Sequence, residues 1–241
     1  MELQGKIALV TGASRRIGRE IALALAGAGA DLALHYFRSA QAARQLTEEV
    51  RSLGRRAEVF QADLAVPQQI ADLLEAVGAA FGHLDVLVNN AALCQPTPID
   101  TLTPQQWDAA LAVNARAAAL CIHHALRWMP AGGTIVNIAD AAITSRPDHL
   151  AYCASKAALL ALTANCAVAL APRGIRVNAV SPGIALWQEG DGEELKQQML
   201  RRIPLGRIGG AESVTQAVLF LLRSDYVTAQ DLRVDGGWHM G

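Results

Sequence analysis

The sequence lacks the features of nucleic-acid-binding and membrane proteins. Its 241 residues carry a formal net charge of −1, so there is no general basic attraction for nucleic acid. The longest apolar run, AALLALTANCAVALA (157–171), is shorter than the roughly 18 residues of a membrane span and contains Thr163 and Asn165. The N-terminus shows no signal-peptide pattern. We therefore expect a cytosolic protein with no nucleic-acid or membrane partner.

Signs of disulfides and metal sites are also scarce. The chain has four widely spaced cysteines and no CxxC pair, so free thiols are expected in a reducing cytosol. There is no HExxH pattern, and the adjacent His123 and His124 point to different faces of a predicted helix. No metal site is predicted.

Short apolar runs alternate with longer helical patterns, and no linker or repeat interrupts them. Strands are predicted at 6–11, 31–37, 56–62, 84–89, 133–139, 175–180 and 231–235. Helices are predicted near 17–28, 40–53, 67–81, 104–129, 151–172 and 211–223. This alternation predicts one α/β domain (1–241) with a seven-stranded parallel sheet and helices on both faces.

One segment breaks this alternation. Residues 181–210 are long, charged and rich in glycine and proline, and such insertions are usually functional or disordered. Because it follows the sixth strand, the segment should overhang the carboxyl edge of the sheet, where doubly wound folds bind ligands. We interpret residues 184–210 as a substrate lid; a plain surface loop is the alternative.

A phosphate-binding turn is predicted between the first strand and the first helix. In TGASRRIG (11–18), Gly12 and Gly18 permit a tight turn and a close helix–strand approach. Free N–H groups at the start of the helix favour a pyrophosphate. The turn is unusual because Arg15 and Arg16 occupy positions where small residues are normal.

The end of the second strand indicates which dinucleotide is bound. An NAD-specific site has an acidic residue there to bind the 2′-hydroxyl, but Tyr36 stands at about that position. Arg38 and Ser39 follow, and arginines match a phosphate in charge and fork geometry. With Arg15 and Arg16 in the neighbouring turn, they predict NADPH, which carries a 2′-phosphate; solvated surface charge is the alternative.

The segment NIADAAITSRPDHLAYCASK (137–156) contains a candidate catalytic pair. Tyr152 and Lys156 are four residues apart at the start of a predicted helix, which places them on one face about 5–6 Å apart at Cβ. A nearby ammonium lowers the pKa of a tyrosine towards useful acid–base chemistry. Asp140, at the preceding strand end, and Asn114, on the middle helix, can reach the same edge. Alone, YxxxK also fits an ordinary exposed helical pair.

Together these segments resemble the short-chain dehydrogenase/reductase family across essentially the whole chain. The resemblance rests on TGASRRIG, NNAA (89–92), Asn114, Tyr152 with Lys156, SPG (181–183) and VDGG (234–237). It implies a Rossmann domain, usually a tetramer, that transfers hydride from a nicotinamide. Tyr152 would donate the proton, Lys156 would bind the nicotinamide ribose and lower the pKa of Tyr152, and Asn114 would hold a relay water.

The predicted cofactor site extends beyond the glycine turn. Residues that follow the third strand are candidates for the adenine edge, and the small residues of NNAA let the backbone approach a cofactor. The predicted set is Gly12, Ser14, Arg15, Arg16, Ile17, Gly18, His35, Tyr36, Arg38, Ser39, Asp63, Leu64, Asn90, Ala91, Tyr152, Lys156, Pro182 and Gly183.

Two departures from the family pattern narrow the expected reaction. Arg16 replaces a loop glycine, and Asp140 replaces the catalytic serine if the loop before Tyr152 is one residue short. A carboxylate would repel the developing alkoxide of a ketone unless it were protonated. It suits a nitrogen heterocycle that presents N–H donors and gains a proton when C=N is reduced.

This pattern, with LHYFRSAQAA, NNAALCQPTP and PGIALWQEG, resembles the pteridine reductases, including bacterial dihydromonapterin reductase-like members. The resemblance implies NADPH-dependent reduction of dihydropteridines, and in some members of oxidised pterins or folates, to tetrahydro forms. Alternatives are a carbonyl reductase acting on a ketoacyl thioester or sugar, and a non-catalytic NADP(H)-binding regulator. The predicted catalytic residues are Asp140, Tyr152, Lys156 and Asn114.

The predicted substrate site departs from that branch at one position. Pteridine reductases have an aromatic residue, at the position of Cys94, that sandwiches the pterin against the nicotinamide. Trp187 in the lid is a candidate replacement, with a packing anchor as the alternative. The predicted substrate contacts are Arg16, Cys94, Asp140, Tyr152, Leu186 and Trp187.

The helix near 151–172 is apolar nearly all round. On a monomer its outer face would expose a large apolar patch. We therefore expect a subunit interface along this helix, and the family resemblance implies a homotetramer.

Overall fold

The computed structural model describes residues 1–143, 146–187, 190 and 192–240. Seven strands form one parallel sheet in the order β3-β2-β1-β4-β5-β6-β7. Their bounds are β1 Ile7–Val10, β2 Asp31–Tyr36, β3 Ala57–Gln61, β4 Val86–Asn89, β5 Thr134–Ile138, β6 Arg176–Pro182 and β7 Asp231–Val234. The predicted strands and the parallel sheet are confirmed.

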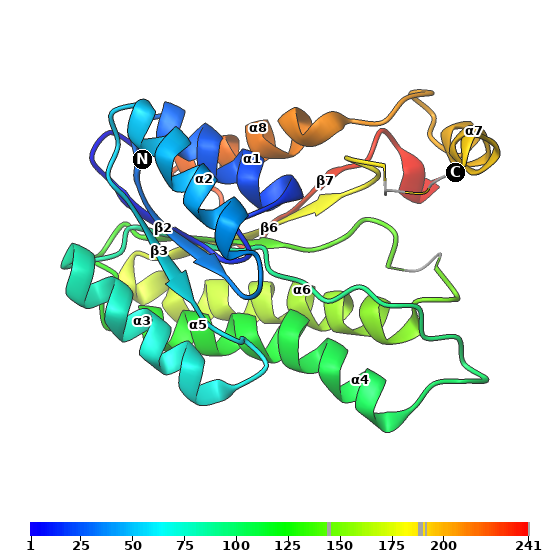
Figure 1. Cartoon of the computed structure of the whole chain (residues 1–241), viewed down its shortest axis with the longest axis horizontal. Helices are drawn as coiled ribbons and strands as arrows, with labels where there is room; N and C mark the ends of the chain where they lie inside the picture. Colours follow the sequence, from blue (N-terminus) through cyan, green and yellow to red (C-terminus); the bar gives the residue numbers. More distant parts are fainter. Residues whose placement is uncertain (144–145, 188–189, 191, 241) are drawn as a thin grey trace.

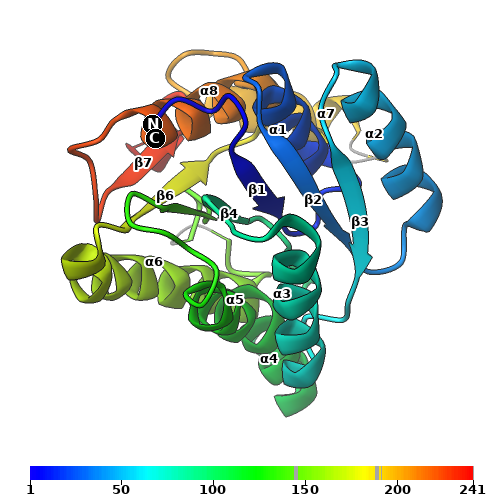
Figure 2. The ribbon, with the colours of Figure 1, turned by 90° about the vertical axis from the view of Figure 1, so that its left-hand side faces the viewer.

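Helices cover both faces of this sheet (Figures 1 and 2). On one face lie α1 (Arg16–Gly27), α2 (Ala40–Ser52) and α8 (Gly210–Arg223). On the other lie α3 (Pro67–Phe81), α4 (Pro104–Leu111), α5 (Ala117–Ala125) and α6 (Leu150–Leu170). The strand order reverses between β1 and β4, and such a switch point creates the ligand-binding crevice at the carboxyl edge of a doubly wound sheet.

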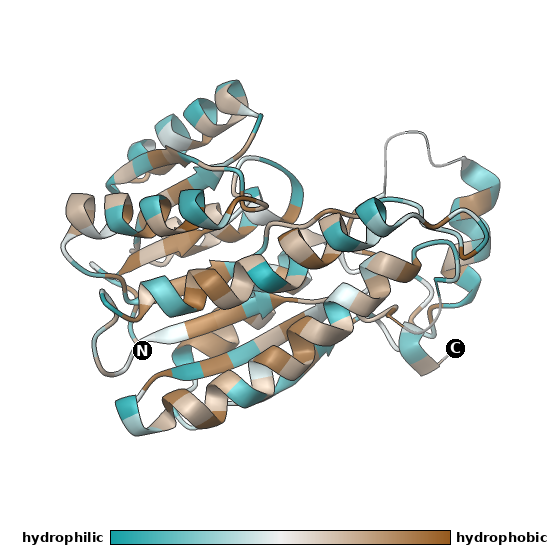
Figure 3. Ribbon diagram, turned by 90° about the horizontal axis from the view of Figure 1, so that it is seen from below, coloured by the Kyte–Doolittle hydropathy of each residue, from teal (hydrophilic) through white to brown (hydrophobic). Residues whose placement is uncertain are grey.

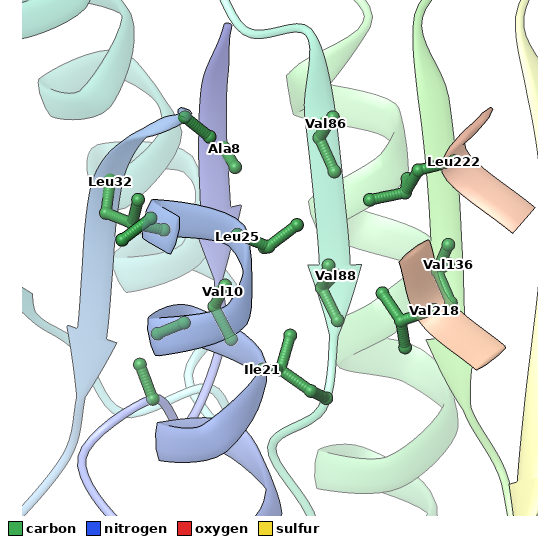
Figure 4. Packing of buried hydrophobic residues seen from close by; sticks show 14 of the residues in the cluster. Ala8, Val10, Ile21, Leu25, Leu32, Val86, Val88, Val136, Val218 and Leu222 are labelled. Atoms are coloured by element: carbon green, nitrogen blue, oxygen red, sulfur yellow. The ribbon is translucent and has the colours of Figure 1, made fainter. Parts of the chain in front are cut away.

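The core explains why the strands are almost continuously apolar. Ala8 and Val10 of β1 belong to the cluster that packs under α1 and α8, whereas Ile7 and Leu9 belong to the cluster under α3 and α5. Figure 4 shows the first cluster, in which Ile21 of α1 lies among the strand side chains. Figure 3 shows hydrophobic colours running along the strands and the helices beside them. Both faces are buried, so alternation with polar residues is lost.

Two sequence predictions were wrong in detail. The helix predicted near 104–129 is interrupted by a π-helical turn, η1 (Ala112–Arg116). The segment 181–210, predicted as irregular, contains α7 (Glu193–Arg201), which lies at one end of the molecule (Figure 1). Acidic residues in the first turn of α7 and Arg201 in the last turn complement the helix dipole. Lid residues 188, 189 and 191 lie outside the described residues.

The segment Leu150–Arg173, which includes α6, is long and apolar enough to cross a membrane by length and composition alone. The estimate from residues 157–171 was too short because the helix begins seven residues earlier. Its inner face packs against the sheet and α4, and it carries the buried Tyr152 and Lys156. A core helix of a folded domain meets the same criterion, so the hydropathy is weak support for a span.

Candidate active site

The glycine turn and the end of β4 are held together through backbone. Gly12 has a φ of 63°, and a Cβ there would lie 2.9 Å from Ala91 Cα. A Cβ on Gly18 would lie 2.3 Å from Gly12 O. Asn90 Nδ2 donates to Thr11 O at 2.9 Å, and Thr11 Oγ1 accepts from the backbone N–H groups of Asn90 and Ala91. The two segments approach so closely that only glycine fits at these two positions.

Arg16 occupies the loop position at which the short-chain dehydrogenase/reductase pattern has glycine, and it keeps a backbone conformation that favours glycine. Its φ is 52°, in the left-handed region, where a non-glycine residue costs about 1–2 kcal/mol. Its Nη2 donates to Leu186 O at 3.4 Å. The turn and the predicted lid therefore meet through Arg16, and the partly buried Trp187 follows directly.

Of the residues predicted to bind the 2′-phosphate, Arg15 and Ser39 are in contact and Arg38 follows β2 in the chain, whereas Arg16 contacts Leu186 instead. Arg15 Nε donates to Ser39 Oγ at 2.7 Å. The Arg38 guanidinium lies over the Phe37 ring, 4.7 Å from its centroid. The Arg15 side chain is exposed and is bonded to a hydroxyl group rather than a carboxylate. This donor set fits the 2′-phosphate of NADPH.

His35 supports the glycine turn from behind. Gly12 N donates to His35 Nδ1 at 3.0 Å, and His35 Nε2 lies 3.1 Å from Ala62 O. Burial lowers the pKa of His35 to about 4, so the ring is neutral, with Nδ1 as acceptor and Nε2 as donor. Both ring nitrogens are thus used by the backbone, and neither is free for the direct cofactor contact that the sequence suggested.

The other predicted cofactor residues border the same edge. Asp63 Oδ1 accepts from Ala65 N at 2.9 Å, which turns the chain after β3. A Cβ on Gly183 would lie 2.8 Å from Asp235 Cα, so the end of β6 closely approaches the VDGG segment. The remaining predicted residues belong to the glycine turn, the start of α1, the end of β2, the segment after β3 and the end of β6: Ser14, Ile17, Tyr36, Leu64 and Pro182.

The structure joins Tyr152 directly to Asp140. Tyr152 Oη donates to Asp140 Oδ2 at 2.8 Å, while Asp140 Oδ1 accepts from Ala142 N at 2.7 Å. Burial raises the pKa of Tyr152 well above its ordinary value, and the Asp140 charge and hydrogen bond raise it further. The net shift of the Tyr152 pKa is thus upward, Lys156 is not among its main causes, and a lowering of this pKa by Lys156 stays a prediction.

Lys156 is buried and donates to a backbone carbonyl rather than to the Tyr152 hydroxyl. Its Nζ donates to Ile138 O at 2.6 Å and lies 5.8 Å from the centroid of the Tyr152 ring. Burial lowers the pKa of this ammonium to about 8, and the Asp140 charge acts in the opposite direction. The four-residue spacing thus brings the two residues to one place, but it does not make them direct partners.

Asn114 is positioned by the π-helical turn, a feature frequent at functional sites. Its Nδ2 donates to Leu93 O at 2.9 Å and to Ser155 Oγ at 2.8 Å, and its Oδ1 accepts from Leu93 N. Ser155 Oγ donates in turn to Tyr152 O at 2.6 Å. Asn114 thus links the end of β4 to α6, and its role in holding a water stays a prediction.

Sequence reasoning missed Arg146. Its Nη1 lies 3.6 Å from Asp140 Oδ2, and its guanidinium lies 5.4 Å from the centroid of the Tyr152 ring. Its charge also lowers the pKa of the Cys94 thiol, although burial raises that pKa by more. The signal available in the sequence was a single arginine six residues before the candidate tyrosine.

Comparisons with known proteins identify similar sequences and similar folds. A family model described as enoyl-(acyl carrier protein) reductase matches residues 12–239. A 3-oxoacyl-[acyl-carrier-protein] reductase of Staphylococcus aureus is 38% identical over 242 residues, covering 98% of each chain. A short chain dehydrogenase from Burkholderia cenocepacia, solved with NADP, has a TM-score of 0.93 and 39% identity, covering 99% of each chain. A blue fluorescent protein from a metagenomic library, solved with NADPH, has 37% identity, the same TM-score and the same coverage.

The chain belongs to the short-chain dehydrogenase/reductase family, with a single-domain Rossmann-like α/β fold. A further similar structure is the reductase LugOII, described as catalysing keto-reduction in lugdunomycin biosynthesis, at 36% identity and a TM-score of 0.93 over 100% of both chains. The names of these relatives refer to oxoacyl and keto substrates rather than to pteridines. They favour the carbonyl-reductase alternative over the pteridine expectation.

Proposed function

We propose that the chain is an NADPH-dependent reductase of a conjugated C=N bond in a nitrogen heterocycle, with a dihydropteridine as the leading substrate. NADPH would supply the hydride. Arg15, Arg38 and Ser39 would bind its 2′-phosphate, the N–H groups at the start of α1 would bind its pyrophosphate, and Lys156 would bind its nicotinamide ribose. The structures solved with NADP and NADPH support this choice of cofactor.

One observation carries the substrate class: the hydrogen bond from Tyr152 Oη to Asp140 Oδ2. A tyrosine hydroxyl has one proton, and an ionised carboxylate only accepts hydrogen bonds. The pair therefore presents acceptor atoms to an incoming substrate. A ketone oxygen has no proton to offer them, whereas a pterin ring carries N–H and NH₂ donors. In this mechanism Asp140 holds a substrate N–H group, and Tyr152 transfers its proton to the ring nitrogen.

Surrounding residues supply the walls of the proposed substrate site. Arg16 links the glycine turn to Leu186, and both residues are proposed substrate contacts. Trp187 is the proposed stacking residue, because Cys94 has no aromatic face. Asn114 and Ser155 fix the position of α6, and thereby the direction of the Tyr152 side chain.

Carbonyl reduction is the second candidate, favoured by the 38% identity to oxoacyl reductases. A ketone oxygen needs hydrogen-bond donors as charge develops on it. As in the pterin mechanism, the Tyr152 proton must then leave Asp140, and Asp140 supplies a second donor only if it is itself protonated. A ketoacyl thioester or a sugar are the substrate classes for this reading.

NADPH oxidation by the wild type and by Asp140→Ser separates these two functions. The substrates are 7,8-dihydrobiopterin or dihydromonapterin in one series and an acetoacetyl thioester in the other, with NADH controls. We expect the wild type to reduce the pterin, and the serine variant to lose about 10²-fold of that activity and to gain activity on the thioester. Wild-type turnover of the thioester alone would overturn the pteridine proposal.

We also propose that the protein is a cytosolic homotetramer that assembles through α6. The outer face of this helix exposes Val168, whose side chain is 74% accessible, together with a row of alanines. An apolar face of this kind favours burial in an interface. Light scattering at micromolar concentration tests it: a monomer would contradict the proposal, and Val168→Asp should lower the assembly state of a tetramer.

A further inference from the structure

We infer that Arg146 is a positioning residue that decides whether the Tyr152 hydroxyl faces Asp140 or a bound substrate. The guanidinium and the hydroxyl share one oxygen, Asp140 Oδ2, at 3.6 Å and 2.8 Å. The other oxygen of Asp140 is held by Ala142 N at 2.7 Å. Only Oδ2 is therefore contested, and a closer approach of Arg146 weakens the hold of the carboxylate on Tyr152.

The chain around Arg146 fixes its backbone and leaves its side chain room to move. Its carbonyl accepts from His149 N at 3.0 Å and from Cys153 Sγ at 3.8 Å, which ties it to the start of α6. Its side chain is 24% accessible, compared with 15% for Asp140. The guanidinium thus reaches the pair from the same helix end that carries Tyr152.

The charges at this corner act on Tyr152 in opposite directions. Asp140 raises the pKa of Tyr152, while Arg146 lowers it, although burial is the larger cause. The other titratable groups near the pair come from the segment after β4 and from the start of α6: Cys94, His149, Cys153 and Lys156. Lys156 Nζ also lies 5.8 Å from the centroid of the Tyr152 ring, but it donates to Ile138 O, whereas Arg146 makes the ion-pair contact with Asp140.

The kinetic consequence follows from the competition for Oδ2. Without Arg146, Asp140 Oδ2 is left to Tyr152, so the carboxylate holds the tyrosine proton more tightly and the pKa of Tyr152 rises. The inference rests on the proposed function in one respect, namely that Tyr152 is the proton donor. It holds for either substrate class, because both need the tyrosine proton.

Arg146→Gln tests the inference, with Arg146→Lys as the conservative variant. Arg127→Gln is the matched control, since that exposed residue pairs with Glu75 far along the chain from the site. We expect Arg146→Gln to lower kcat about 10-fold, with an unchanged KM for NADPH and a basic limb of the kcat–pH profile shifted to higher pH. Arg146→Lys should restore most of kcat and most of the wild-type kcat–pH profile, and the control should match the wild type.

A second measurement does not depend on turnover. Protein labelled with 3-fluorotyrosine gives a fluorine NMR signal for Tyr152, assigned with Tyr152→Phe, whose pH titration reads the hydroxyl directly. We expect Arg146→Gln to move this titration upward by roughly one pH unit, the size of a nearby charge effect. If neither substrate is reduced, the proposed function fails while this titration still decides the role of Arg146. An unmoved titration overturns the inference, as does an unchanged pH profile in an active enzyme.

Discussion

The two halves of the binding edge are built from different kinds of contact. At the ends of β1 and β2 the glycine turn is held by backbone atoms, by the neutral ring of His35 and by spaces that admit no side chain. At the end of β5 the Tyr152–Asp140–Arg146 group is held by side-chain charges from separate segments. The glycine turn is held by backbone contacts and therefore tolerates few substitutions. In the Tyr152–Asp140–Arg146 group, one substitution can change the hydrogen bonds and the pKa values. This contrast explains how a shared cofactor site serves different substrates within one fold.

The largest expected effect lies in the substrate half. Tyr152→Phe removes the proposed proton donor but leaves the glycine turn untouched. We expect kcat to fall by about 10³-fold, while NADPH binding, followed by fluorescence titration, stays within about twofold. The same variant tests the third reading, a non-catalytic NADP(H)-binding regulator, which predicts no loss in any measured property.

In the cofactor half, a substitution at a closely packed glycine should weaken NADPH binding and lower the stability. Gly18→Ala places a methyl group 2.3 Å from Gly12 O, so the turn must shift. We expect the Kd for NADPH to rise at least about 10-fold and the free energy of unfolding to fall by about 1–3 kcal/mol. Gly27→Ala, in the same helix, meets no atom within 4 Å and is the matched control. Equal effects of the two substitutions would refute the close-packing argument.

Lys156 gives a pH-dependent prediction for the substrate half. The unfolded chain keeps this proton up to its ordinary pKa of 10.5, whereas the folded protein releases it near 8. Between these values the unfolded state binds more protons, so stability rises with pH. Burying the charge thus costs the folded protein on the order of 1–3 kcal/mol below pH 8. In urea denaturation, the stability of Lys156→Met relative to the wild type should be highest below pH 8 and should decline towards pH 10; a constant difference would contradict the prediction.

The smallest expected effect comes from Arg15, at the exposed end of the proposed cofactor site. Arg15→Gln removes one cation from a solvated site, so screening limits the change. We expect the ratio of kcat/KM for NADPH over NADH to fall about 10-fold, with kcat for NADPH little altered. An unchanged ratio would favour the alternative in which Arg15 is ordinary surface charge. Arg127→Gln again serves as the control.

Much of the fold was predictable, because the strands are short and the five central ones are buried on both faces; the edge strands β3 and β7 are partly exposed. Apolar runs between helical patterns located all seven strands, and the glycine spacing located the turn. The π-helical turn escaped prediction because Ala112–Arg116 has the same periodicity as the helices that flank it. Helix α7 escaped because it contributes no buried residue to the core, and the glycines and prolines around it indicated a loop.

The sequence by itself determined the family, the sheet and which candidate residues meet at its carboxyl edge, because spacing along a strand or helix fixes which residues share an edge. Only the tertiary structure decided how those residues pair. In the folded protein Lys156 donates to Ile138 O, and the Tyr152 hydroxyl donates a hydrogen bond to Asp140. His35 is buried behind the glycine turn, and Arg146 lies beside the same carboxylate. These outcomes depend on burial and on distances between segments far apart in the chain. Such quantities set hydrogen bonds and pKa values, and no local pattern encodes them.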